Sequence, residues 1–300
     1  MREAAQEATD PSISRLRHHG AEREFTMHLA RQNAAILIAL ILAARVIAKQ
    51  APTVHQNGAN ARTVPMLYVD GRPVISVTIN GRGPYRMVLD TGAKDTVVSP
   101  GWVGGRTEQT DIDLRVGDQA YTHFPAWSFP LPRGFPKGVL SAEAFPGELV
   151  TLDFPKRTVT FQRGSLPPAD GRRIFQYEAG DLLPTVPIRV GGHEMRVCVD
   201  SGNPRGLDLP LRLSAEIPLA GRLVAAGKGG IITNEGDPAK VAMFSAHVMG
   251  AVELGEYTLD TPTIRFRDQP APWPGDFGNE ILRTFRVTID ASNRRLLFER

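Results

Sequence analysis

Two stretches of this chain repeat one pattern: "RMVLDTGAKDTVV", Arg86 to Val98, and "RVCVDSGNPRGLDL", Arg196 to Leu209. In each, an apolar run typical of a buried strand leads directly into Asp, a hydroxyl residue and Gly. A single such tripeptide is most simply a turn, because Asp, Ser, Thr and Gly all favour turns. Average residue frequencies give roughly 0.1 such tripeptides in a chain of this size, so two behind matching strands indicate more than chance.

The segments downstream of the two turns repeat as well. "GVLSAEAFPGELVTLDFPKRTVTF" (Gly138 to Phe161) aligns without a gap on "GDFGNEILRTFRVTIDASNRRLLF" (Gly275 to Phe298). The chain therefore reads as two copies of one β-rich unit, joined by "RGSLPPADG", Arg163 to Gly171. We predict an all-β fold with an N-terminal lobe over residues 65–165 and a C-terminal lobe over residues 171–300, related by a pseudo-twofold axis.

The second copy is longer than the first. Asp90 and Asp200 are 110 positions apart, whereas the downstream segments are offset by 137, so the second copy holds 27 additional residues (137 − 110). The glycine-rich stretch Ala225 to Lys240 falls within them, and it has neither the spacing nor the Ser or Thr of a phosphate-binding loop. A glycine-rich mobile hairpin fits it better.

The composition fits a globular β-rich protein and names no charged partner. The 300 residues are 42% hydrophobic, with 29 Gly, 24 Pro and a net charge of +3 that is spread along the chain. There is no nucleic-acid-binding motif, and the histidines show no metal-ligand spacing, so we expect no nucleic-acid partner, no metal and no cofactor. Cys198 is the only cysteine, and it lies in an apolar run, which favours a buried structural thiol.

The N-terminal region, residues 1–64, differs from the rest. A basic segment with His28 and Arg31 precedes an apolar run from Ala34 to Ala44, and Val46-Ile47-Ala48 offers small residues for a signal peptidase. The run is short for a membrane span of about 20 residues, so we predict an export signal and a mature chain that begins near Lys49. A membrane anchor over residues 34–48 and a buried helix are the alternatives. Residues 50–63 are predicted to be a mobile polar linker, and the exported protein is expected to be periplasmic or secreted.

The two Asp turns also suggest a chemistry. If the pseudo-twofold axis passes between them, Asp90 and Asp200 become neighbours and share a proton, since two adjacent carboxylates cannot both ionise cheaply. One can then deprotonate a water while the other protonates a carbonyl oxygen. Thr91 and Ser201 are suited to hold the opposite turn by hydroxyl-to-backbone bonds, and Gly92 and Gly202 let the backbone approach the carboxylates.

On these residues, each unit resembles a retropepsin-type aspartic protease subunit, and the chain from about Pro65 to Arg300 resembles a bacterial aspartyl protease with two fused units. The closest matches are "VLDTGAKDTVVS", "VCVDSG" and "FGNEILRTFRVTIDASNRRLLF". The resemblance implies one catalytic Asp per lobe, Asp90 and Asp200, and an extended peptide in a cleft between β-barrel lobes. It also implies a flap over the cleft, for which Gly227, Gly229 and Gly230 are the candidates, and a monomer that is an internal pseudo-dimer.

The sequence departs from this family pattern in three ways. Ser141 stands where the family has Gly, Asn203-Pro204 follows Asp-Ser-Gly, and the first copy has little room for a flap. Two functions are therefore carried forward: an exported aspartic endopeptidase acting on peptides or proteins, and a non-catalytic peptide-binding or scaffold protein. Asp153 and Asp290, which are equivalent to each other, are predicted to cap the turns of two C-terminal hairpins.

Overall fold

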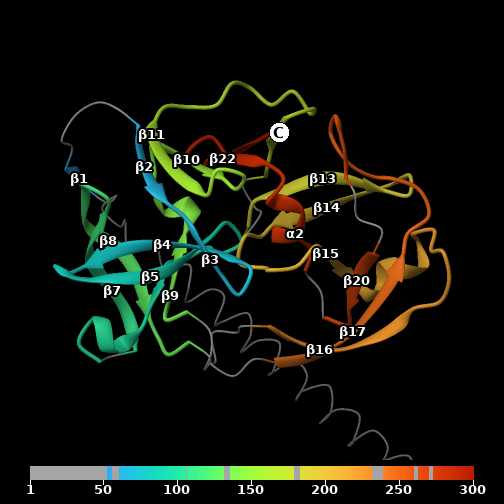
Figure 1. The fold of residues 1–300 in the computed structure, drawn as a ribbon, viewed down its shortest axis with the longest axis horizontal. Helices are drawn as coiled ribbons and strands as arrows, with labels where there is room; N and C mark the ends of the chain where they lie inside the picture. The colour runs from blue at the N-terminus through green and yellow to red at the C-terminus, as the bar shows by residue number, and fades with distance from the viewer. Residues whose placement is uncertain are drawn as a thin grey trace, which may run out of the picture. The chain divides into compact units, whose positions relative to one another are not determined.

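The computed structural model describes residues 53–55, 61–105, 107–131, 136–178, 183–231, 239–259, 263–269 and 273–300. The predicted signal or anchor segment lies outside these residues. Within the described part of the chain, no helix is long and apolar enough to cross a membrane. The structure confirms the predicted fold class, because the described residues form β-strands with only short helical turns between them (Figure 1).

Three sheets contain the strands. The first-lobe sheet holds β1 (Thr53–His55), β3 (Leu67–Val69), β4 (Arg72–Ile79), β5 (Arg82–Asp90), β6 (Val97–Val98), β7 (Glu108–Val116), β8 (Gln119–Ser128) and β9 (Gly138–Ser141). The second-lobe sheet holds β13 (Thr185–Val190), β14 (His193–Val199), β15 (Leu207–Pro210), β16 (Val224–Ile231), β17 (Ala239–His247), β18 (Val252–Leu254), β19 (Tyr257–Leu259), β20 (Thr263–Arg267) and β21 (Asp276–Phe277). The central sheet holds β2 (Arg62–Pro65), β10 (Glu148–Asp153), β11 (Thr158–Arg163), β12 (Ile174–Gln176), β22 (Arg286–Asp290) and β23 (Arg295–Glu299). Between strands lie the 3-10 helices η1 (Pro100–Trp102), η2 (Ala142–Ala144) and η3 (Leu211–Ala215), and the short helix α2 (Asn279–Leu282).

The two lobe sheets repeat one topology. The order β8-β6-β9-β5-β4 in the first lobe matches β20-β15-β21-β14-β13 in the second. The directions match too, because β5 pairs with β9, and β14 with β21, in parallel, while β6–β9 and β15–β21 are antiparallel. The duplicated sequence therefore folds into duplicated lobes.

The central sheet marks the pseudo-twofold axis. Its strand order is β12-β23-β22-β10-β11-β2. Each half contributes three strands, and the equivalent strands β22 and β10 pair in the middle. At that junction Thr151 faces Thr288, 137 positions later, and their buried hydroxyl groups lie 2.9 Å apart in a hydrogen bond. The axis thus passes between two residues that the repeat makes equivalent.

One sequence expectation is wrong in part: residues 50–63 are not all linker. Thr53–His55 pairs with β8, and Arg62–Pro65 pairs with β11 at the edge of the central sheet. The polar composition of the intervening residues concealed these strands, although both carry β-branched residues, which favour edge pairing. The central sheet therefore starts at Arg62, ahead of the predicted lobe boundary at Pro65.

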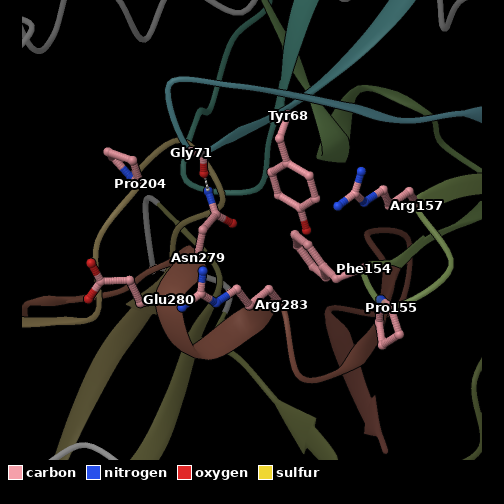
Figure 2. Close-up of a pocket in the computed structure, with 9 residues that line it drawn as sticks. All are labelled: Tyr68, Gly71, Phe154, Pro155, Arg157, Pro204, Asn279, Glu280 and Arg283. Carbon is pink, nitrogen blue, oxygen red and sulfur yellow. Dashed lines mark hydrogen bonds between the residues drawn. The ribbon is translucent and has the colours of Figure 1, made fainter.

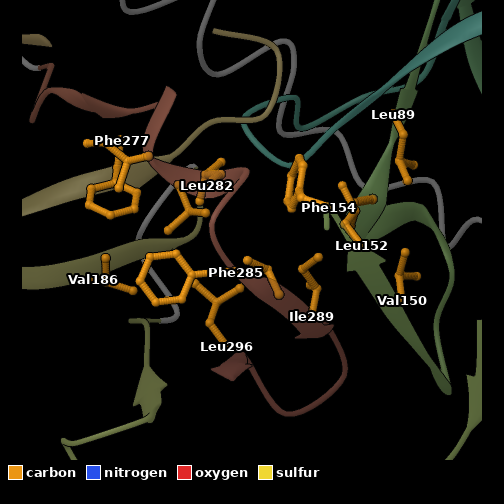
Figure 3. Close-up of a cluster of buried hydrophobic side chains, with 14 of the residues drawn as sticks. Leu89, Val150, Leu152, Phe154, Val186, Phe277, Leu282, Phe285, Ile289 and Leu296 are labelled. Atoms are coloured by element: carbon orange, nitrogen blue, oxygen red, sulfur yellow. The ribbon is translucent and has the colours of Figure 1, made fainter. Parts of the chain in front are cut away.

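Buried side chains surround the strands that lead to the two Asp turns. Met87, Val88 and Leu89 in β5 are buried in succession, as are Val197, Cys198 and Val199 in β14. Such continuous burial is expected for strands with parallel neighbours and both faces covered. Figure 3 shows Leu89 within the hydrophobic cluster, together with Phe277 and Phe285 of the second lobe. The apolar runs therefore fix the positions at which Asp90 and Asp200 leave the core.

Two other predicted aspartates cap hairpin turns, as expected. Asp153 Oδ1 accepts from the Lys156 amide at 3.0 Å, and Asp290 Oδ1 accepts from the Asn293 amide at 3.1 Å. These equivalent contacts close the β10–β11 and β22–β23 turns. The predicted structural role of both residues is confirmed.

Candidate active site

The two Asp-hydroxyl-Gly turns interlock. Thr91 Oγ1 donates to the Val199 carbonyl at 2.5 Å and accepts from the Ser201 amide at 2.9 Å. Reciprocally, Ser201 Oγ donates to the Leu89 carbonyl at 2.7 Å and accepts from the Thr91 amide at 3.0 Å. Both side chains are buried. Each hydroxyl therefore holds the backbone of the opposite lobe, and the four bonds keep the turns in register.

The interlocked turns bring the two carboxyl groups together. A Cβ atom added at Gly92 would lie 2.7 Å from Asp200 Cγ, and one at Gly202 would lie 2.2 Å from Asp90 Oδ2. Only glycine leaves this space free, so these two glycines are needed for close approach. The Gly92 amide donates to Asp90 Oδ1 at 2.8 Å, and the Asn203 amide donates to Asp200 Oδ1 at 3.0 Å.

Removal from water raises the pKa of both carboxyl groups. Burial is the main cause for Asp90, whose pKa lies above its usual value. Burial and then the charge of Asp90 raise the pKa of Asp200 to about 8. A pair in this setting retains a proton over a wide pH range, which suits it to combined acid and base chemistry.

Ser141 and Asn203, which depart from the family pattern, both make hydrogen bonds that support the Asp turns. Buried Ser141 donates through Oγ to the Ala93 carbonyl at 2.6 Å, so its hydroxyl supports the first Asp turn. In the second turn, the donor to Asp200 is the Asn203 amide, one residue before Pro204. Pro204 has no amide proton, but the hydrogen bond to Asp200 is unaffected because Asn203 donates it.

Sequence reasoning missed three residues that border the site. Arg72 Nε donates to the Gly202 carbonyl at 2.8 Å, and Asn279 Nδ2 donates to the Ser201 carbonyl at 2.6 Å. The third is Asp276, which is 6% exposed and whose charge acts on Asp90. The repeat aligns Asp276 with Val139, 137 positions earlier. A carboxylate in place of an apolar residue at this strand position was the sequence signal that could have identified it.

Asp276 belongs to a buried charge cluster in the second lobe. Trp273 Nε1 donates to Asp276 Oδ1 at 3.0 Å, and an Arg267 nitrogen lies 3.6 Å from Oδ2. Arg267 also pairs with the fully buried Asp208, which Arg265 contacts at 2.6 Å. Burial and the Asp200 carboxyl group raise the pKa of Asp276 to about 8. A third titrating carboxyl group therefore stands beside the pair.

The candidate flap residues lie in the β16–β17 hairpin. Gly227 has φ +89° at a bulge between Ala225 and Lys228, and a Cβ at Gly229 would lie 2.4 Å from Met243 Sδ. These contacts explain two of the glycines, and Gly230 continues the strand opposite Lys240. Residues 232–238 lie outside the described residues, so the flap role stays a prediction.

No group of three or more His, Cys, Asp or Glu side chains that could hold a metal ion occurs among the described residues. No family model matches this chain, and no curated protein matches it. Among solved structures, an aspartic proteinase from Irpex lacteus is similar, with 11% identity and a TM-score of 0.49 over 79% of this chain and 96% of that one.

Proposed function

We propose that this protein is an aspartic endopeptidase that hydrolyses peptide bonds with a water activated by Asp90 and Asp200. One observation supports the proposal: two equivalent Asp turns are locked by reciprocal hydroxyl bonds, and the charge of Asp90 acts on the half-buried carboxyl group of Asp200. A non-catalytic scaffold has no need for such a pair. Two adjacent carboxyl groups removed from water destabilise the folded protein at every pH at which both ionise.

The proposed reaction uses the single proton that the pair shares. The ionised carboxylate takes a proton from a water molecule, whose oxygen forms a bond to the peptide carbonyl carbon. The protonated partner gives its proton to the carbonyl oxygen, which yields a neutral tetrahedral diol. When the C–N bond breaks, the carboxyl group that took the water proton gives it to the departing nitrogen, and the other carboxylate takes a proton from a diol hydroxyl, which leaves a carboxylic acid and an amine. The pair ends with one proton, as it began.

The proposal includes the setting in which the enzyme works. We infer export to the periplasm or the medium from the basic and apolar segment before Lys49, and a monomer from the internal duplication. Peptides or proteins are the proposed substrates. The direct test is cleavage of a peptide mixture by the purified chain, stopped by an aspartic-protease transition-state mimic. Binding of peptides without any cleavage favours the non-catalytic alternative.

The pH dependence of hydrolysis is expected to be bell-shaped, with the basic limb near pH 8. Below that limit the pair holds a proton, since burial and Asp90 raise the pKa of Asp200 to about 8. Above it both carboxylates ionise and the acid is lost. Rates of peptide cleavage across pH 3–10 measure the profile.

The Asp276→Asn variant is expected to move the basic limb to lower pH, because Asp276 no longer adds negative charge as the pair ionises. Asn keeps the acceptor for Trp273. Asp268→Asn, an exposed change nearby, is the control and should leave the profile in place. A basic limb near pH 5 in the unmodified protein would contradict the proposed role of burial.

Shortening the β16–β17 hairpin is expected to raise KM and lower kcat together. In this variant an Asn-Gly turn replaces residues 230–240 and preserves the pairing of Gly229 with Val241. Loss of a closing element is expected to reduce kcat/KM by about ten-fold or more. Replacing Gly117-Asp118, the β7–β8 turn, with Asn-Gly is the control. Unchanged steady-state kinetics in the shortened variant would remove the hairpin from the mechanism.

A further inference from the structure

A cavity of about 410 Å³ lies where the first-lobe strand β3, the β10–β11 turn and the second-lobe helix α2 meet. Tyr68, Phe154 and Arg157 line it from the first half of the chain, and Pro204, Asn279 and Arg283 line it from the second (Figure 2). Its volume falls in the range of small-molecule and peptide-end sites. Neither catalytic carboxyl group lines it.

Asn279 presents an unused acceptor to this cavity. Its side chain is buried, and Nδ2 donates to the Gly71 carbonyl at 3.0 Å and to the Ser201 carbonyl at 2.6 Å. These two carbonyls fix the orientation of the amide, because only its nitrogen can face them. Oδ1 therefore points away from them, as Figure 2 shows, and it has no partner among the described residues. A buried acceptor without a partner is costly, so a donor from a ligand would relieve it.

Tyr68 presents an unused donor on the other wall. Its hydroxyl oxygen is buried and has no partner among the described residues. Burial raises the pKa of Tyr68, so the hydroxyl keeps its proton. The charges of Arg157 and Arg283 both act on this hydroxyl, and the Arg157 guanidinium carbon lies 5.7 Å from the Tyr68 ring centre. One neutral donor and two cations thus line the cavity, with the Glu280 carboxylate on the side away from Tyr68 and Arg157.

We propose that this cavity binds the C-terminal end of a peptide. The terminal carboxylate would take donors from Tyr68, Arg157 and Arg283, and the amide N–H of the last residue would donate to Asn279 Oδ1. Phe154, Pro155 and Pro204 supply apolar wall for the terminal side chain. An inorganic oxyanion would leave those walls uncovered, which is why the peptide end fits the cavity better.

Titration calorimetry with the full chain tests the proposal. The probe is acetyl-Ala-Ala-Phe with a free carboxylate, and its C-terminal amide and inorganic phosphate are the comparison ligands. We expect one saturable site for the acid and at least about ten-fold weaker binding of the amide, which cannot accept charge-assisted bonds. Equal binding of acid and amide, tighter binding of phosphate, or no binding of the acid at millimolar concentration overturns the proposal.

Variants locate the binding. Arg157→Gln and Arg283→Gln should each weaken binding of the acid by about ten-fold, and Tyr68→Phe by about three-fold to ten-fold. Tyr68→Phe removes only an unpartnered hydroxyl, so its thermal midpoint should not fall. The exposed Arg222→Gln is the matched control. Binding that the first three variants leave intact places the peptide elsewhere and overturns the proposal.

Discussion

Asp90→Asn and Asp200→Asn are each expected to reduce peptide hydrolysis by roughly 10²–10⁴-fold or more while leaving the protein folded. An amide can neither take a proton from water nor give one to a carbonyl oxygen, and the pair needs both actions. Because the two carboxyl groups act as a unit, the double variant should be little worse than either single one. Initial rates with one fluorogenic peptide measure the loss, and the exposed Asp118→Asn is the matched control.

Stability separates loss of chemistry from loss of fold. The pKa of both Asp90 and Asp200 is raised in the folded protein from the ordinary value of 3.8. Folding therefore favours their protonated forms, and stability is lost as pH rises from about 4 through the folded-state pKa of about 8. Each Asn variant should lose less stability over this interval, with a thermal midpoint at pH 8 no lower than that of the unmodified protein. A folded Asn variant that cleaves peptides at a near-normal rate would exclude the pair as the catalytic centre.

Thr91→Ala is expected to lower the free energy of unfolding by about 2–5 kcal/mol, because it leaves two buried backbone groups without a hydrogen-bond partner. The Val199 carbonyl loses its donor and the Ser201 amide loses its acceptor, and both lie in the opposite lobe. Thr91→Ser keeps the hydroxyl and should recover most of the stability. Urea unfolding at constant pH measures both variants.

The same variant should lower kcat more than it raises KM. Thr91 does not contact the water or the carbonyl in the proposed reaction, but it holds the two carboxyl groups in register. A shift of about 1 Å in such a group can cost 10²-fold in rate. If Thr91→Ala is as stable and as active as the unmodified protein, the reciprocal hydroxyl bonds do not hold the lobes together.

The chain's duplication could be read from the sequence because it is written in local patterns. Apolar strands ending in Asp-hydroxyl-Gly and the gap-free match of residues 138–161 with 275–298 predicted an all-β fold of two similar lobes. The capping roles of Asp153 and Asp290 followed from the same register. These features depend on neighbours close along the chain, which is why composition and spacing were enough to predict them.

The contacts between lobes required the tertiary structure, since they join residues far apart in sequence. The sequence predicted that the Thr91 and Ser201 hydroxyls hold the opposite turn, but not which carbonyl each one reaches, 108 or 112 positions away. It gave no sign of the Asn279 bond to Ser201 or of the cavity beside it. It also concealed the short strands Thr53–His55 and Arg62–Pro65, which are stable only because β8 and β11 offer them free edges. Local pattern determined the strands and turns of this protein, whereas the electrostatics of its paired carboxyl groups come from burial and proximity, which exist only once the two lobes pack together.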